Sequence, residues 1–314
     1  MTTTVTGLSG DNPFDVELAT QEYTTQLEVL LQQKLSILRG LVDSKGGYRG
    51  KQASPVQQIG TLEFKAPAGR FATLQPTEPN YTRRWVSPTF KDLPVLVDTL
   101  DELQTIVDPK AGIQEATVDA ANRFFDDLII AAFFATAKVG VEGASTESWP
   151  ATTYLVADTF GASASTGMTY PKLVEAFRMM RHFQVDLENE EPCVIIGSQQ
   201  EADLKKQQEV INHDYNGGMV VEEGHITGLG GFQIHVSERL QTNNTLRYCP
   251  AFVKSGMHLG IWQDLNVSVT QREDLSEHPW QLYAAVGAGA TRTQLGKVIQ
   301  INCADTTGPD PTAP

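Results

Sequence analysis

The feature that most constrains the fold of this chain is the stretch from residue 46 to residue 90, which is polar and rich in proline. Proline lacks an amide hydrogen and clashes with the preceding helical turn, so its spread through the stretch excludes a long helix. These prolines are Pro55, Pro67, Pro76, Pro79 and Pro88. We predict a hairpin with two extended arms and a polar tip at about residues 66–80. With so few apolar side chains it cannot bury much of itself, so it is either mobile or packed on another molecule.

Helical periodicity occurs on both sides of this stretch. Apolar residues at three- and four-residue steps predict a helix from Asp15 to Val42 with one apolar stripe. The strongest pattern runs from Ile113 to Ala137, and about 25 helical residues make a rod of about 37 Å. Such a rod is long for a globular protein, and its single apolar face needs a sheet to lie across.

The remaining segments mix strands with shorter helices, which predicts an α+β fold. A short strand and a short helix fill residues 93–109, and the Asp108–Pro109 pair is expected to end that helix. Residues 138–168 indicate a surface excursion containing one short strand. A helix then begins at Thr169 and Pro171, a suitable cap and first-turn residue. A buried strand, a polar helix, two strands around glycines and a strand-rich end (246–303) follow.

The stretch "GHITGLGGFQIHV" offers two interpretations. Glycines at Gly228, Gly230 and Gly231 could cradle a phosphate, which would make the chain a nucleotide-binding α/β enzyme using Gly228–Gly231. A phosphate loop needs a helix N-terminus directly after the glycines. Residues 232–236 instead alternate as a strand does, so we predict a turn that uses the positive φ available to glycine.

Composition and motifs favour no enzymatic chemistry. The formal net charge of −14 argues against a nucleic-acid reader, which needs a basic patch. The three cysteines and six histidines are scattered, so we expect no metal site and no cofactor. Asp126–Asp127 lacks the oxygen spacing of a calcium loop and is expected on a solvated face. The longest apolar run, about ten residues, is too short for a membrane span of about twenty.

The order of these elements resembles the major capsid proteins of tailed bacteriophages, whose fold is shared by herpesvirus shells and encapsulin nanocompartments. The segment "RRWVSPTFKDLPVLVDTLDELQTIVDPKAGIQEATVDAANRFFDDLIIAA" is similar to the hairpin-to-spine-helix segment of a podovirus-like branch of this family. The segment "DYNGGMVVEEGHITGLGGFQIHVSERL" is similar to its strand-and-turn pattern. The resemblance covers about residues 14–303.

The resemblance implies a division of the chain into the parts of that capsid fold. The N-terminal arm would be 1–45, and the extended hairpin loop 46–92 would lie over a neighbouring subunit. The peripheral domain would combine 93–165 and 256–303 around the spine helix 113–137. A mixed α/β axial domain, 166–255, would pack around the five- and six-fold axes. Residues 304–314 would form a disordered tail.

The expected function is therefore that of a major capsid protein. Its pentamers and hexamers would form an icosahedral head that encloses double-stranded DNA, which an acidic lining would not trap. Expected partners are a portal protein, a separate scaffolding protein and a decoration protein, with assembly in the host cytoplasm and no membrane. The rivals are an encapsulin-type enzyme container and the nucleotide-binding enzyme described above. The residues expected to make subunit contacts are Arg70, Phe71, Arg83, Arg84, Trp85, Leu27, Leu31 and Leu38.

Overall fold

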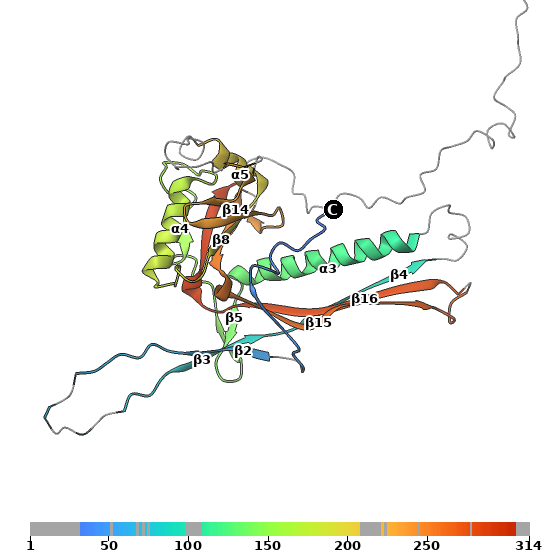
Figure 1. The fold of residues 1–314 in the computed structure, drawn as a ribbon, viewed down its shortest axis with the longest axis horizontal. Helices are drawn as coiled ribbons and strands as arrows, with labels where there is room; N and C mark the ends of the chain where they lie inside the picture. The colour runs from blue at the N-terminus through green and yellow to red at the C-terminus, as the bar shows by residue number, and fades with distance from the viewer. Residues whose placement is uncertain are drawn as a thin grey trace, which may run out of the picture.

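The computed structural model describes residues 32–50, 53–66, 69–70, 73, 76–97, 109–207, 221–222, 225–243, 245–276 and 278–305. Figure 1 shows three parts: an α/β lobe, a long sheet with one helix along it, and a thin hairpin that leaves the body at the opposite end. Among the described residues no helix combines the length and the apolar character needed to cross a membrane.

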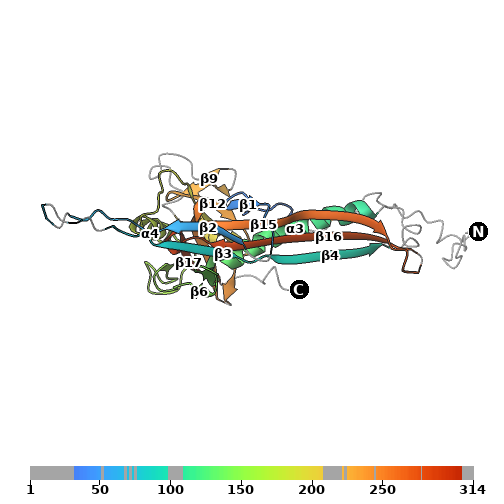
Figure 2. The same ribbon diagram turned by 90° about the horizontal axis from the view of Figure 1, so that it is seen from below.

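The long sheet carries the longest helix of the described chain. Its strand order is β1-β15-β16-β4, with β1 parallel to β15 and the other pairs antiparallel. The strands are β1 (Asp43–Gly46), β4 (Thr89–Val97), β15 (Met257–Gln271) and β16 (Trp280–Arg292). Helix α3 (Pro109–Phe134) runs along one face of this sheet (Figure 2).

Helix α3 matches the rod predicted from the sequence, but both of its ends differ. It spans Pro109–Phe134, whereas the apolar pattern predicted residues 113–137. Pro109 occupies the first position of α3, where its missing amide costs no hydrogen bond. At the other end the chain turns into strand β5 (Ala137–Val139). The short helix expected just before Pro109 lies outside the described residues.

The lobe is built on a second sheet with the order β11-β12-β8-β14-β17-β7, and β13 pairs with β14. Its strands are β7 (Leu155–Val156), β8 (Pro192–Ile196), β11 (Gly228–Leu229), β12 (Phe232–Val236), β13 (Thr242–Asn243), β14 (Leu246–Val253) and β17 (Val298–Ala304). Helices α4 (Tyr170–His182) and α5 (Ser198–Lys205) accompany it, as the sequence predicted. One core joins this sheet to α3 and α4.

The hairpin grows from a small third sheet with the order β2-β3-β5-β6. Its strands are β2 (Ala53–Ile59), β3 (Tyr81–Val86), β5 and β6 (Ser145–Glu147). Strands β5 and β6 belong to the segment predicted as a surface excursion, which therefore forms the base of the hairpin. The strands β9 (Val221–Glu222) and β10 (His225–Ile226) form a separate pair. Short 3₁₀ turns occupy Lys254–Gly256 and Leu295–Lys297.

The arm helix predicted for Asp15 to Val42 is wrong over residues 32–42. These residues form bends and turns, and β1 follows them directly. The physical reason is that polar groups of α3 bind the backbone of this segment, as described below, in place of the hydrogen bonds of a helix. Leu38 and Val42 still bury their side chains in the core, which is why they contributed to a helical pattern. Residues 1–31 lie outside the described part of the chain.

Candidate assembly interface

The hairpin presents apolar side chains that the described residues leave exposed. Ile59 and Leu62 are 64% and 61% exposed, and Phe64 is fully exposed. The amide of Gly60 donates to the carbonyl of Asn80 at 2.7 Å, which links the two arms just beyond β2 and β3. Exposed apolar groups on a thin projection cost solvation free energy unless a partner covers them. The hairpin is therefore the first candidate for a contact with another molecule.

The base of the hairpin is fixed by contacts within the chain. Arg84 is 8% exposed and forms an ion pair with Glu147 of β6. The indole nitrogen of Trp85 donates to the carbonyl of Gly140 at 2.8 Å. Gly143, at φ +72°, lies so close to the Trp85 ring that a Cβ would be 3.0 Å from it. The hairpin thus projects from a stiff base.

Arg292, the last residue of β16, caps the C-terminal end of α3. Its guanidinium is 1% exposed and donates to the carbonyls of Phe133 at 2.6 Å and Ala135 at 3.1 Å. It also lies over the Trp149 ring, 4.7 Å from the centroid. Burial, aided by the charge of Arg84, lowers the pKa of Arg292 to about 10. Arg292 therefore stays charged at neutral pH and complements the partial negative charge of the helix end.

The end of the arm is held on α3 by a buried carboxylate, Asp126. This side chain is fully buried and accepts hydrogen bonds from Ser36 Oγ at 2.6 Å and from the amides of Ile37 at 3.1 Å and Leu38 at 3.2 Å. The side-chain amide of Gln33 donates to it as well. A buried charge needs such complete hydrogen bonding. The sequence interpretation that placed Asp126 on a solvated face was therefore wrong.

Further polar groups of α3 extend this contact along the arm. Glu115 pairs with Lys34 at 2.8 Å, and Asn122 donates to the carbonyl of Lys34 at 2.8 Å. Arg123 donates to the side chain of Gln32 at 2.7 Å. Asp127, next to Asp126, does lie at the surface, where it pairs with Arg239 at 2.6 Å. One side of α3 is thus a polar binding surface for the arm.

A second contact holds the segment between the arm and the hairpin on β15. His258 has a fully buried side chain that lies 3.1 Å from the Asp43 carboxylate and 3.1 Å from the Tyr48 hydroxyl. Burial lowers the pKa of His258, although Asp43 opposes this effect, and burial also raises the pKa of Tyr48. Trp262 packs on Tyr48 and donates to the carbonyl of Gly50 at 3.0 Å.

The residues expected at subunit contacts occupy different environments. Arg70 and Arg83 are exposed, whereas Leu38 is fully buried in the core and Arg84 and Trp85 are engaged at the hairpin base. Phe71, Leu27 and Leu31 lie outside the described residues. A single chain tests no contact with a second one, so their role between subunits stays a prediction.

The glycine stretch forms a turn, as predicted. Gly230 and Gly231 have φ of +62° and +88° and connect the antiparallel strands β11 and β12. A strand and not a helix follows them, so the amides and dipole of a helix N-terminus are not there to bind a phosphate. Within the described ranges no three histidine, cysteine or acidic side chains converge on a point that could hold a metal ion. All three cysteines are buried and free.

Comparisons with known proteins agree with this architecture. The family model described as "Phage capsid protein" matches residues 17–305. Among solved structures, a chain from the capsid of the cyanophage P-SCSP1u is 15% identical, with 92% of this chain and 94% of that chain covered and a TM-score of 0.72. The capsid of Ralstonia phage GP4 gives 12% identity, 98% and 100% coverage and a TM-score of 0.71. The capsid of cyanophage Pam1 gives 9% identity, 98% and 100% coverage and a TM-score of 0.71. No curated protein matches the chain.

Proposed function

The chain belongs to the phage capsid protein family and is a major capsid protein, a structural component of the virion rather than an enzyme, and we propose that its copies form pentamers and hexamers of an icosahedral head. The head encloses double-stranded DNA without binding a particular sequence. The net charge of −14 supports this role, because an acidic lining does not retain the genome. The family match favours a phage head over an encapsulin-type container.

The observation that carries the proposal is the hairpin of residues 46–92. It projects from the body (Figure 1). Its apolar side chains Ile59, Leu62 and Phe64 are exposed. In a closed shell each copy can cover the hairpin of its neighbour, so symmetry satisfies every hairpin at once. Arg83 and Arg70 are exposed, and in this proposal they pair with acidic groups of that neighbour.

The same proposal assigns a role to each part of the chain. The described end of the arm, from residue 32 to residue 45, binds along α3 through the contacts of Asp126 and joins the proposed peripheral domain of residues 93–165 and 256–303. The lobe is the axial domain at the five- and six-fold axes. Besides residues 166–255 it contains β7 and β17, which the sequence interpretation had assigned to the peripheral domain. The tail predicted from residue 304 is wrong at its start, because Ala304 is the last residue of β17 and Asp305 pairs with Arg247, whereas residues 306–314 lie outside the described part. A portal protein, a separate scaffolding protein and a decoration protein complete the set of proposed partners.

The test is a deletion that uses the hydrogen bond between Gly60 and Asn80. Residues 61–79 are replaced by a short glycine linker, which leaves β2 and β3 intact. We expect a soluble chain with an unchanged circular dichroism spectrum that forms no heads when it is expressed with the proteins of its phage. Closed heads of normal size from this deletion would refute the assigned role of the hairpin.

A further inference from the structure

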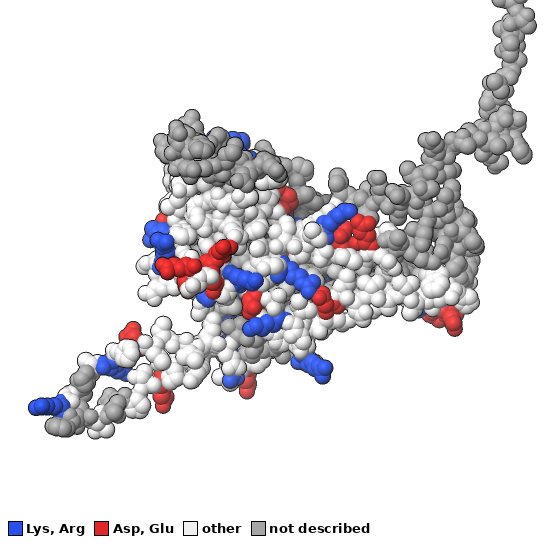
Figure 3. Space-filling view, viewed as in Figure 1, with Lys and Arg blue, Asp and Glu red and all other residues white. Residues whose placement is uncertain are grey.

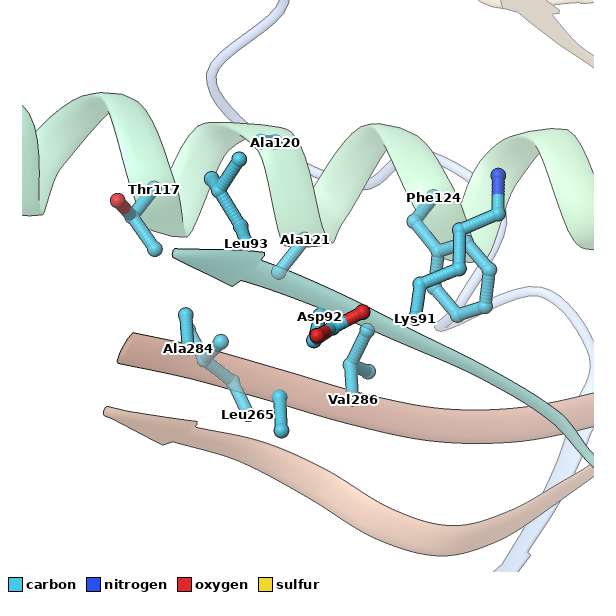
Figure 4. Close-up of a pocket in the computed structure, with 11 residues that line it drawn as sticks. Lys91, Asp92, Leu93, Thr117, Ala120, Ala121, Phe124, Leu265, Ala284 and Val286 are labelled. Carbon is cyan, nitrogen blue, oxygen red and sulfur yellow. The ribbon is translucent and has the colours of Figure 1, made fainter. Parts of the chain in front are cut away.

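A cavity lies between α3 and the long sheet, away from every contact described above. Its volume is about 180 Å³, and it is open to the surface on one side. Figure 4 shows that Ala120, Ala121 and Phe124 of α3 face Leu93, Ala284 and Val286 of the sheet across it. The alanines leave the space, because their side chains are too short to bridge the helix and the strands.

The cavity has the size and character of a site for one aromatic ring. An apolar cavity of roughly 150 Å³ in another protein is known to bind benzene. The walls here are mostly aliphatic or aromatic, and the two charged residues, Lys91 and Asp92, come from one strand, β4. The Lys91 ammonium lies 5.3 Å from the centre of the Phe124 ring. In the view of Figure 3, few charged side chains of the described residues lie over the long sheet.

The hairpin carries a matching group. Phe64 is fully exposed, and its chain neighbours are Glu63 and Lys65. The acidic Glu63 beside this aromatic ring is complementary to Lys91 of β4, whose side chain lies on the α3 side of the sheet at the edge of the cavity. Complementary charges of this kind fix the register of a contact.

We propose that Phe64 of one copy inserts into the cavity between α3 and the long sheet of a second copy, with Glu63 near Lys91. The ring cannot come from the same chain, because the hairpin leaves the body at the end opposite to the part of the sheet that α3 covers (Figures 1 and 2). This inference rests on the proposed role of the hairpin and names the site that receives it.

The first test is a cross-link between copies. The double variant Phe64→Cys and Ala120→Cys is assembled into particles and oxidised; the native cysteines are buried and do not compete. We expect covalently linked dimers and longer chains of subunits on denaturing gels. The control pair, Phe160→Cys with Ala120→Cys, moves the first cysteine to a partly exposed residue outside the hairpin and should stay monomeric. Particles of normal size without a linkage between positions 64 and 120 would overturn the inference while leaving the proposed function intact.

The second test measures assembly. Phe64→Ala and the cavity-filling Ala120→Leu should each raise the protein concentration needed for assembly about tenfold or more, as expected for losing one buried aromatic contact. Phe160→Ala should leave it unchanged. Glu63→Lys and Lys91→Glu should each weaken assembly and partly rescue each other when combined. An effect of Phe64→Ala no larger than that of Phe160→Ala would overturn the inference. So would a cross-link between a cysteine at position 120 and a cysteine introduced within residues 1–31. Failure of the unaltered chain to assemble at all would instead contradict the proposed function.

Discussion

Asp126 and Asp127 are neighbours in sequence, yet the structure gives them opposite roles. Asp126 is fully buried and accepts hydrogen bonds from the arm, whereas Asp127 forms an ion pair at the surface. Hydrogen bonds to a buried charge contribute more than a surface ion pair, whose median value is between 0 and about 1 kcal/mol. The two residues therefore form a natural pair of test and control.

Replacing Asp126 by Asn should destabilise the chain by about 2 kcal/mol, because the amide nitrogen cannot accept the donors of the arm. The midpoint of urea unfolding should fall, and the segment around residues 33–38 should become more susceptible to proteolysis. Asp127→Asn should change the free energy of unfolding by less than about 1 kcal/mol. Equal effects of the two substitutions would show that Asp126 does not hold the arm.

His258 makes the contact between β1 and β15 sensitive to pH. Burial lowers its pKa below the ordinary value of 6.5, so the folded chain favours the neutral imidazole. The buried neutral imidazole therefore adds to the free energy of unfolding in full above pH 6.5. This contribution is lost as the pH falls from 6.5 toward the lowered pKa of His258 in the folded chain. Asp43 and Lys45 lie on β1, the strand that pairs with β15. The Asp43 carboxylate raises the pKa of His258 and the Lys45 ammonium lowers it.

Thermal unfolding measured across this pH range checks the prediction. The melting temperature of the unaltered chain should fall on acidification by more than that of His258→Gln, whose side chain does not titrate. His235, whose pKa burial also lowers, contributes equally to both proteins. Parallel pH profiles would show that His258 does not carry the dependence.

The sequence could not reveal these residues because their partners are distant in the chain. Arg292 binds the carbonyl of Phe133 across 159 positions, and His258 binds Asp43 across 215. Nothing local distinguishes Arg292 from a surface arginine. A faint signal existed for Asp126, which interrupts the apolar run of α3 between Phe125 and Ile129.

At the scale of helices and turns, residues close together in the sequence predicted the structure better than they did for single side chains. The start of α4 follows from Thr169 and Pro171, although the Thr169 side chain makes no capping hydrogen bond. The turn between β11 and β12 follows from paired glycines before an alternating run. The prediction of an arm helix was wrong although the apolar spacing fits a helix. The carboxylate of Asp126 on α3, far away in sequence, binds the backbone amides of Ile37 and Leu38 instead.

The glycine turn provides a prediction with an internal control. Gly231 has φ +88°, and a Cβ there would lie 2.7 Å from the Phe177 ring. Gly231→Ala should cost at least about 1–2 kcal/mol, the strain of a left-handed residue, before the clash is counted. Gly228→Ala, where the nearest atom to a Cβ is 3.6 Å away, should be close to neutral in chemical denaturation. If both substitutions lowered the free energy of unfolding by similar amounts, the positive φ of the turn would not be the reason for glycine at position 231.

At the scale of the whole molecule, the hairpin is the part for which the sequence and the structure lead to the same expectation of a partner. Its prolines and its small number of apolar side chains predicted an extended segment that cannot bury its own surface. In the single chain Phe64 is fully exposed. What a single chain does not contain is the placement of one copy against the next, because that arrangement exists only in the assembly.

Cryo-electron microscopy of the particles formed by the full-length chain tests this account most directly. We predict closed icosahedral shells of pentamers and hexamers in which each hairpin lies on an adjacent subunit. A population of single chains with residues 46–92 packed against their own body would contradict it.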